Sequence, residues 1–503
     1  MAALEVTYNT LVTDSKEITD LGSIAGLLSW DQETMMPPKA IEAKARQLSL
    51  MSGIIHRRQT DEKRGEWIDK LAAGLDTLAP EQQATVLECR RVFDKLRKLP
   101  PELVEEESRL CSLAHDEWIK ARKESKFEIF APWLEKIFAI KKRIADYWGY
   151  PDTPYDAMLD DYEPGSTTAS VGGVLGDLRD KLVPWVHGIA ASPVKPRTDF
   201  LSRGFPKDAQ RELGLAVIRA IGFDLDAGRV DISAHPFCSG TGNDVRLTTR
   251  YFEDQPFASF YGMIHEAGHG LYEQGLHPEH LGAPLGSSST MSIHESQSRL
   301  WENVIGRSKS FVAHFEKNLR AAYPEQLRGV SIDEIYAAVN RVEPSLIRVE
   351  ADEVTYGLHI VVRFEIEREL MSGALPVADL PAAWNARMEK YLGITPPNDA
   401  EGCLQDVHWS LGLVGYFPSY ALGSLNAAQL FAAARRDLPG LDAKLAAGEY
   451  KVLLEWLREK VHRLGRRYTP DDLIEHVTGK RPSADDFMAY IADKFGALYG
   501  VKV

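Results

Sequence analysis

The chain has 503 residues, 44% hydrophobic and 26% charged, a balance typical of a globular protein that can bury a large core. Its formal net charge of -14 repels phosphate backbones and anionic lipid, which argues against nucleic acid and membrane surfaces as partners. Length alone is compatible with two or three domains or with a single large body.

The cysteines and the N-terminal residues bear on the cell compartment in which the protein is expected to act. Four cysteines (Cys89, Cys111, Cys238 and Cys403) include no CxxC pair, so neither a disulfide framework nor a thiolate zinc site is expected. The N-terminal residues lack a basic start followed by an apolar run, and no run of about 18 apolar residues occurs. We therefore expect a cytoplasmic protein without a membrane span.

Helical periodicity covers most of the chain. Residues 40–59, 103–125 and 133–150 place apolar side chains three and four positions apart, with charged residues between them. The clearest loops are "SPVKPRTD" (192–199) and "GITPPNDAEG" (393–402), and neither changes the composition enough to mark a domain boundary. The pattern predicts a mostly α-helical protein.

One segment departs from the helical pattern. In residues 228–252, "GRVDISAHPFCSGTGNDVRLTTRYF", β-branched residues alternate with polar ones around the Gly-rich turn "SGTGN". This pattern predicts a short β-hairpin, and it comes shortly before the most informative motif in the chain.

That motif is "MIHEAGHGLYEQG", residues 263–275. On a helix, His265 and His269 stand one above the other on the same face, so both imidazoles can reach one ion. HExxH on a helix supplies two of the three protein ligands of a catalytic zinc. Glu266, rotated by about 100°, lies beside the ion, where it can act as the general base for a metal-activated water.

The rest of this helix is compatible with a metal site. Phe260, Ile264, Ala267 and Leu271 form a separate apolar stripe, so one flank can be buried while the histidines face a cleft. Gly268 and Gly270 each weaken a helix by about 1 kcal/mol relative to alanine, which suggests that something approaches the backbone closely. The alternative is a chance HExxH whose histidines lie in the core.

The third ligand has to come from outside this helix. A metzincin would need glycine at 272 and histidine at 275, where this chain has Tyr272 and Gly275. Glu273 lies about 12 Å along the axis from His265, which makes it a solvated or outer carboxylate. Glu295, in the following helical pattern "IHESQSRLWENVIG", is the better candidate.

Two points limit this choice. His294 is next to Glu295 in the chain, and two neighbours on a helix cannot both face the ion. Glu295 could instead form an intrahelical ion pair with Arg299, four residues later.

These residues resemble the carboxypeptidase Taq family of metallocarboxypeptidases. Six motifs of that family occur in order along the chain, and the stretch from about residue 30 onward is also similar to it. The six are "HPF" (235–237), "DVRLT" (244–248), "HEAGH" (265–269), "HESQ" (294–297), "IRVEAD" (347–352) and "GCLQDVHW" (402–409).

The resemblance implies a large helical body with a deep central groove, similar to neurolysin and angiotensin-converting enzyme, with the small hairpin or sheet beside the active site. It implies one metallopeptidase domain over 1–503, with two lobes flanking the groove. We expect residues 1–150 to form a wall or lid and residues 228–425 to carry the active site. It also implies zinc or sometimes cobalt, held by His265, His269 and Glu295, peptide substrates, and a homodimer.

An exopeptidase must recognise the free carboxylate of its substrate, and a guanidinium matches a carboxylate best. Arg348, in "IRVEAD", is the first candidate; its alternative role is an ion pair with Asp352. Arg246, in "DVRLT", is the second candidate, and Asp244 on the same strand face could neutralise it.

Hydrolysis builds negative charge on the carbonyl oxygen, so donors besides the metal should face it. "DVHWSLGLVGYFPSY" offers His408, Tyr416 and Tyr420, and similar peptidases use a histidine and a tyrosine in this region. We choose His408 with Tyr420, although core packing could explain both tyrosines. His235, held extended by the following proline, is expected to shape the groove wall.

The sequence thus predicts a zinc carboxypeptidase of broad specificity, with Glu266 as general base. The enzymatic alternative is a neurolysin-like oligopeptidase that cuts short peptides internally. The non-enzymatic alternative is a helical scaffold with a structural metal; the retained Glu266 argues against it, because a structural site needs no base and is usually closed by four protein ligands.

Overall fold

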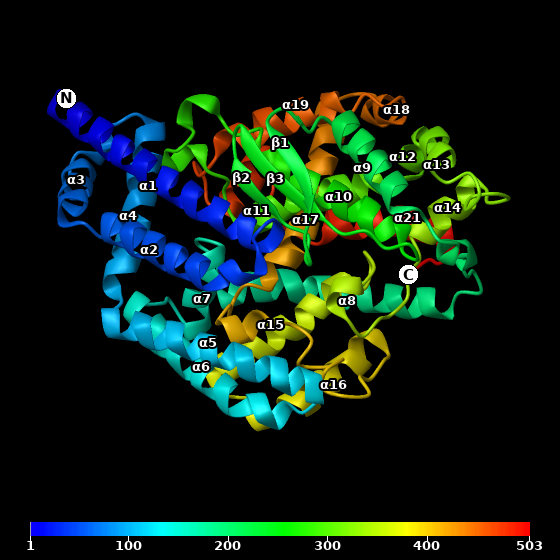
Figure 1. Ribbon diagram of the computed structural model, residues 1–503, viewed down its shortest axis with the longest axis horizontal. Coiled ribbons are helices and arrows are strands. Elements are labelled where there is room, and N and C mark those ends of the chain that lie inside the picture. The colour runs from blue at the N-terminus through cyan, green and yellow to red at the C-terminus, as the bar shows by residue number, and fades with distance from the viewer. Residues whose placement is uncertain (1) are drawn as a thin grey trace.

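The computed structural model describes residues 2–503 and is mostly helical, with one small sheet (Figure 1). The N-terminal helices share a small core that the buried side chains of α1, α3 and α4 form, among them Leu11, Ile68 and Phe93. These helices and their neighbour are α1 (Ala2–Thr34), α2 (Ile41–Gln59), α3 (Glu62–Ala72) and α4 (Pro80–Lys98).

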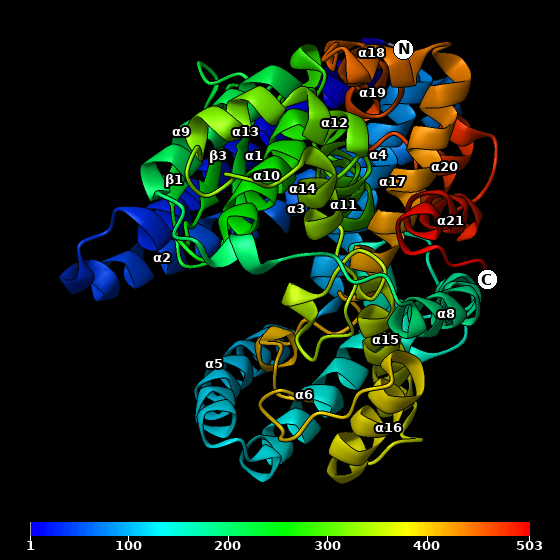
Figure 2. The ribbon, with the colours of Figure 1, turned by 90° about the vertical axis from the view of Figure 1, so that its right-hand side faces the viewer.

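A second group of helices, here called the α15 lobe, encloses one large hydrophobic core. Figure 2 shows α5, α6, α15 and α16 together in the lower part of the molecule. The lobe contains α5 (Pro101–Glu124), α6 (Phe127–Trp148), α7 (Pro154–Tyr162), α8 (Thr168–Ala191), α15 (Tyr356–Ser372), α16 (Leu380–Leu392) and α21 (Asp485–Tyr499).

A third group, the α10 lobe, has a core of its own and carries the sheet. Its central helix is α10 (Pro256–Glu273), followed by α11 (Met291–Arg299) and the π-helical segment η6 (Leu300–Gly306). Around them lie α9 (Lys207–Ile221), α12 (Lys309–His314), α13 (Glu316–Ala322), α14 (Ile332–Val339), α18 (Leu441–Ala446), α19 (Lys451–Lys460) and α20 (Pro470–Thr478).

One helix connects the two large cores. Helix α17 (Pro418–Asp437) contributes Leu422 and Leu425 to the core of the α15 lobe, and Leu430 and Phe431 to the core of the α10 lobe. Such a helix has to be apolar on nearly every side, and most of its residues are indeed buried.

The sheet corrects one detail of the sequence interpretation. Strands β2 (Cys238–Thr241) and β3 (Asp244–Thr249) form the expected antiparallel hairpin, but β1 (Gly228–Ile232) adds to β3 in parallel. The strand order is therefore β1-β3-β2, a three-stranded mixed sheet instead of a hairpin alone. The local pattern around the turn predicts the hairpin, whereas a parallel pairing depends on contacts between separate segments.

The three predicted helices are confirmed as α2, α5 and α6. Both predicted loops lie outside the helices and strands, except that Asp199 begins the 3-10 turn η3 (Asp199–Ser202). Among the described residues, no helix is both long and apolar enough to cross a membrane.

Candidate active site

Helix α10 presents the HExxH motif as its sequence predicts. The apolar stripe of Phe260, Ile264, Ala267 and Leu271 is buried in the core of the α10 lobe. His265 and His269 stand one turn apart on another face, with ring centroids 4.9 Å apart. The helix therefore buries one flank and keeps both imidazoles available for a ligand.

Two glycines allow α11 to approach closely from both sides. A Cβ at Gly268 of α10 would lie 2.6 Å from the Cα of Ser298, and a Cβ at Gly423 of α17 would lie 2.6 Å from the Cβ of Glu295. No larger side chain fits at either position without moving the backbone of α11. The predicted close approach to Gly268 is thus confirmed, and its effect is to bring Glu295 over the two histidines.

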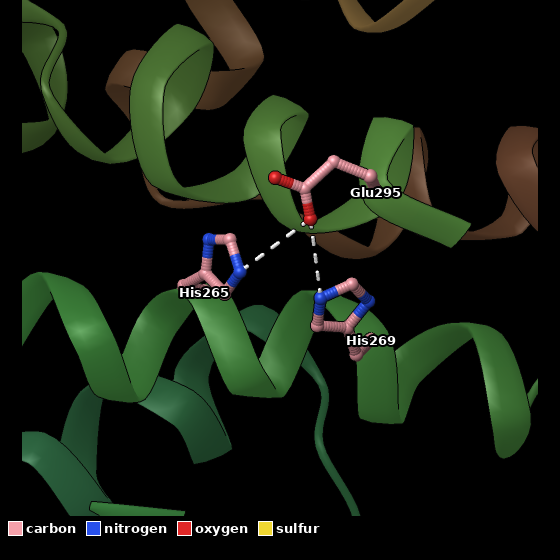
Figure 3. A group of neighbouring side chains, drawn as sticks. All are labelled: His265, His269 and Glu295. Atoms are coloured by element: carbon pink, nitrogen blue, oxygen red, sulfur yellow. Dashed lines mark ion pairs between the residues drawn. The ribbon is translucent and has the colours of Figure 1, made fainter. Parts of the chain in front are cut away.

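The three side chains meet at one point (Figure 3). The Oε2 atom of Glu295 lies 3.6 Å from Nε2 of His265 and 3.4 Å from Nε2 of His269. One ligand atom from each residue lies within 4.8 Å of the other two. Two imidazole nitrogens and one carboxylate oxygen are the donor types that zinc accepts, and three protein ligands leave a position for water or substrate.

The alternative role of Glu295 is also present, on its other oxygen. Oε1 accepts a hydrogen bond from Nε of Arg299 at 2.6 Å, while Oε2 faces the histidines. Burial favours the neutral acid, but Arg299 and His265 hold the pKa of Glu295 well below its usual range. The ion pair therefore keeps Glu295 in the ionised form that a metal needs.

Each histidine also has a partner on its far ring nitrogen. Nδ1 of His265 lies 2.9 Å from Oε2 of Glu302, on η6. Nδ1 of His269 lies 2.5 Å from Nδ1 of His294, whose Nε2 lies 2.9 Å from Glu273. Such outer contacts fix the tautomer and the orientation of a metal-binding imidazole.

The charges around these donors suit a divalent cation. Four carboxylates (Glu266, Glu273, Glu295 and Glu302) and two guanidinium groups (Arg299 and Arg307) belong to this connected group. The group has an excess of two formal negative charges, which one divalent ion would neutralise. Both the charge balance and the donor types therefore fit a catalytic metal.

Glu266 is available for proton transfer. Its side chain is buried and lines the same cavity as the two histidines. Burial raises the pKa of Glu266 to about 7. A carboxylate with a pKa near neutrality can both accept and return a proton at physiological pH.

The cavity has a volume of about 380 Å³ and is formed by both lobes. Its walls combine the metal-facing residues of the α10 lobe with aromatic side chains at the start of α17. The lining residues are Pro236, Phe237, Cys238, His265, Glu266, His269, Met291, His294, Glu295, Tyr416, Ser419 and Tyr420.

Tyr416, Tyr420 and His408 form one group of neighbouring rings near the start of α17. Both tyrosines line the cavity, and Nε2 of His408 lies 3.4 Å from the hydroxyl of Tyr420. Burial lowers the pKa of His408 to about 4, so its imidazole is neutral at pH 7. Trp409 and Phe417 are buried in the core beside this group.

Arg348 lies behind this aromatic group, with its guanidinium 5.0 Å from the ring centroid of Tyr420. It does not pair with Asp352. Its Nε and Nη2 lie 3.0 and 2.8 Å from Oδ1 of Asp406, and Arg363 binds Oδ2 of the same carboxylate. Two buried guanidinium groups thus share one carboxylate, which leaves this arginine cluster with an excess formal positive charge.

The other two candidates lie away from the cavity lining. Arg246 pairs with Asp244, as its alternative role predicts, and stacks on Trp30 of α1 at 4.4 Å. His235 is exposed at the start of "HPF", where its carbonyl accepts a hydrogen bond from the Ser233 hydroxyl. Its neighbours Pro236 and Phe237 line the cavity.

Sequence patterns do not predict several residues of this site, namely Glu302, Arg307, Asp406 and Arg363. Glu302 is seven residues after Glu295, a spacing that places both on one face of a helix, but the π-helical turn η6 has no sequence signal of its own. Asp406 lies inside the "GCLQDVHW" motif, yet nothing local indicates that it joins Arg348 and Arg363.

Similarity to known proteins extends over nearly the whole chain. Residues 10–495 match the family model described as carboxypeptidase Taq (M32) metallopeptidase. The chain is 42% identical to thermostable carboxypeptidase 1 of Thermus thermophilus over 99% of both chains. It is 41% identical to carboxypeptidase 1 of Bacillus subtilis over 96% of this chain and 97% of that one. The M32 carboxypeptidase of Deinococcus radiodurans superposes with a TM-score of 0.96 at 43% identity, covering 99% of this chain and 100% of the other.

Proposed function

The chain belongs to the carboxypeptidase Taq (M32) family and is a metallocarboxypeptidase, and from that premise we propose how its residues divide the reaction. The enzyme removes C-terminal residues from peptides with broad specificity. The observation that carries this proposal is the set of three donor atoms within 4.8 Å of one another at a cavity that Glu266 also lines. The family match does not favour the oligopeptidase alternative.

We propose that His265, His269 and Glu295 hold zinc, with cobalt as a substitute. When bound, such an ion polarises the scissile carbonyl and lowers the pKa of a water molecule. Glu302 keeps the His265 ring oriented, and Arg299 keeps Glu295 ionised.

Glu266 is the proposed general base. It lies in the cavity wall next to His265, and burial raises its pKa to about 7. Its carboxylate accepts the proton from the attacking water and then donates it to the leaving amine. One residue can perform both transfers because its pKa lies near the working pH.

Tyr420 and His408 are the proposed donors to the developing oxyanion. Tyr420 lines the cavity, and Nε2 of His408, whose imidazole is neutral at pH 7, lies 3.4 Å from the Tyr420 hydroxyl. Tyr416 lines the same wall, with its ring 5.3 Å from that of Tyr420. Donors that are already oriented stabilise the transition state without a reorganisation cost.

Arg348 is the proposed anchor for the substrate carboxylate. Because Arg348 and Arg363 share only Asp406, the arginine cluster has one positive charge that no described carboxylate in contact with it balances. A peptide carboxylate beside Tyr420 would supply the missing negative charge. Arg246 remains the second proposal, weaker because Asp244 already neutralises it.

The wall formed by residues 235–238 is the proposed site of backbone contact. Phe237 and Cys238 line the cavity at the start of β2, which is an edge strand of the sheet. An extended peptide can add to such an edge through main-chain hydrogen bonds. We propose that His235 shapes the outer rim of this wall.

We further propose that the chain works as one domain over 1–503, with residues 1–150 as a wall or lid and 228–425 carrying the active site. It is proposed to act in the cytoplasm as a homodimer, neither on nucleic acid nor on membranes. Light scattering on the purified protein tests the dimer, and the measured mass should be twice 56.2 kDa.

The experiment that tests the function uses matched peptides with a free or an amidated C-terminus. Mass spectrometry should show stepwise loss of single C-terminal residues from the free peptides, little loss from the amides, and none after chelation. A pool of peptides with varied C-termini tests the breadth of specificity in the same assay. Internal cleavage of the amides would instead support the oligopeptidase alternative, and turnover that survives chelation would contradict the metal mechanism.

A further inference from the structure

The imidazole of His294 has no role in the reaction described above, although it touches the metal-facing residues. It lies beside His269, with the ring centroids 4.6 Å apart, and Tyr272 packs against it at 5.2 Å. Nδ1 of His294 lies 2.5 Å from Nδ1 of His269, and its Nε2 lies 2.9 Å from Oε1 of Glu273. The three side chains therefore form one continuous chain of contacts, from Glu273 through His294 to His269.

When Nε2 of His269 faces a metal, these three side chains can adopt only one arrangement of histidine tautomers. That nitrogen then has to present its lone pair, so His269 carries its proton on Nδ1. Nδ1 of His294 can then only accept a hydrogen bond from Nδ1–H of His269, which places the proton of His294 on Nε2. The carboxylate of Glu273 accepts a hydrogen bond from that Nε2–H, so each of the two N–H donors has an acceptor.

The geometry also explains why an imidazole, that of His294, lies between His269 and Glu273. Glu273 follows His269 by one helical turn on α10, and His294 enters from α11 to fill the gap between them. Contact with Glu273 on one side and with Tyr272 on another holds the His294 ring. The orientation of His269 is therefore set by two helices together, whereas His265 is oriented by one carboxylate, Glu302.

We infer that Glu273 and His294 are positioning residues for the metal, which select the tautomer and fix the ring of His269 so that Nε2 faces Glu295. This inference rests on the proposed function, because it takes His265, His269 and Glu295 as the metal ligands. It assigns a role to a histidine that is not one of the proposed metal ligands. Partners of this kind typically change metal affinity by about 10- to 100-fold.

The test measures the affinity of the metal-free full-length protein for Zn²⁺ by competition with a chelating dye. His294→Leu removes the acceptor and should weaken zinc binding by about 10- to 100-fold. His294→Gln can still accept from His269 through its oxygen and donate to Glu273 through its nitrogen, so it should restore most of the affinity. Glu273→Leu releases the His294 ring and should weaken binding in the same direction.

Two controls separate positioning from a general loss of structure. His187→Leu replaces an exposed histidine on α8 and should leave zinc affinity unchanged. The melting temperature of each metal-free variant shows whether its fold is intact; if His294→Leu does not fold, Glu273→Leu and His294→Gln decide the question.

The outcomes are distinct. Weaker binding in His294→Leu with recovery in His294→Gln supports the inference. Equal zinc affinity in wild type, His294→Leu and Glu273→Leu would overturn it, as would equal losses in the leucine and glutamine variants of His294. If the wild-type protein itself binds no zinc, the proposed function fails, and that result is independent of the variants.

Discussion

The two sides of the active-site cavity carry opposite charge imbalances. On the α10 lobe, four carboxylates face two arginines around His265 and His269, an excess of two negative charges. Behind the cavity wall opposite, Arg348 and Arg363 share the single carboxylate of Asp406, an excess of one positive charge. All these groups are largely buried, so neither imbalance is screened as it would be at the surface.

The difference shows what each side lacks. An unbalanced buried charge is costly, so each side is suited to a ligand of opposite charge. In the mechanism proposed above, a divalent cation completes the negative side and a substrate carboxylate completes the positive side. A peptide with a free C-terminus that is cleaved at a metal brings these two partners together in one cavity.

The largest expected effect comes from Glu266, the group on the negative side that is not a proposed ligand. Glu266→Gln removes the base but leaves His265, His269 and Glu295 in place. We expect kcat to fall by about 10²- to 10⁴-fold, the usual contribution of general acid–base catalysis, with zinc content unchanged. Steady-state kinetics and metal analysis of the same preparation check both parts. Turnover close to wild type would exclude Glu266 as the base.

The next effect concerns the aromatic wall between the two charged groups. Tyr420→Phe removes only the hydroxyl that lies 3.4 Å from His408. If that hydroxyl stabilises the oxyanion, kcat should fall by about 10²- to 10³-fold, with little change in KM. Tyr416→Phe is the matched comparison on the same wall. A larger loss in Tyr416→Phe would move the oxyanion role to Tyr416.

A smaller effect is expected on the positive side. Arg348→Met leaves Asp406 paired with Arg363 and removes the excess charge. Loss of a charged hydrogen bond of about 1.5–3 kcal/mol should lower kcat/KM by about 10- to 150-fold, mainly through KM. The preference for free over amidated peptides should shrink in proportion.

The same substitution at Arg246 compares the two candidates directly. Arg246 stacks on Trp30 and pairs with Asp244 outside the cavity, so Arg246→Met should change kcat/KM by a few-fold at most. If Arg246→Met, and not Arg348→Met, abolishes the preference for a free carboxylate, the two assignments have to be exchanged.

The smallest effect is on stability and concerns Glu367, a buried carboxylate of the α15 lobe. It accepts hydrogen bonds from Tyr155, Trp409 and the backbone of Gly415, and burial raises its pKa from 4.5 to about 7. Between these values the folded protein holds a proton that the unfolded chain has lost. The free energy of unfolding should therefore fall as pH rises from 4.5 to 7, by at most about 1.4 kcal/mol per pH unit.

Glu367→Gln removes this contribution, because an amide does not titrate. Urea unfolding of the metal-free protein at several pH values between 5 and 8 should give a flatter profile for the variant than for wild type. Parallel profiles would mean that Glu367 is ionised in the folded protein. In that case its negative charge would have to be counted against the excess positive charge of the arginine cluster.

Much of the negative side could be predicted from the sequence, because its residues are identified by their spacing within a short stretch of the chain. The four-residue spacing of His265 and His269 requires only a helix, and the glycine at 268 correctly indicates a close neighbour. The hairpin of β2 and β3 is predicted by its turn for the same reason. Glu302 was missed because a π-helical segment changes the direction of side chains without any pattern that marks it.

The positive side could not be predicted, because its pairings are long-range. The alternative role of Arg348 was a pair with Asp352, four residues away, but the carboxylate that it contacts, Asp406, is 58 residues away. Helical spacing identifies only neighbours on the same helix, and Arg348 is not on an α-helix at all; it begins the 3-10 turn η7 (Arg348–Glu350). The parallel pairing of β1 with β3 was not predicted for the same physical reason.

The proposed mechanism depends most directly on the position at which a metal binds. Crystals of the zinc-loaded protein, measured on both sides of the zinc absorption edge, give the position of the ion without reference to activity. We predict one strong anomalous peak at about 2.0–2.2 Å from Nε2 of His265, Nε2 of His269 and a carboxylate oxygen of Glu295. A peak elsewhere in the molecule, or none beside these three side chains, would contradict the account.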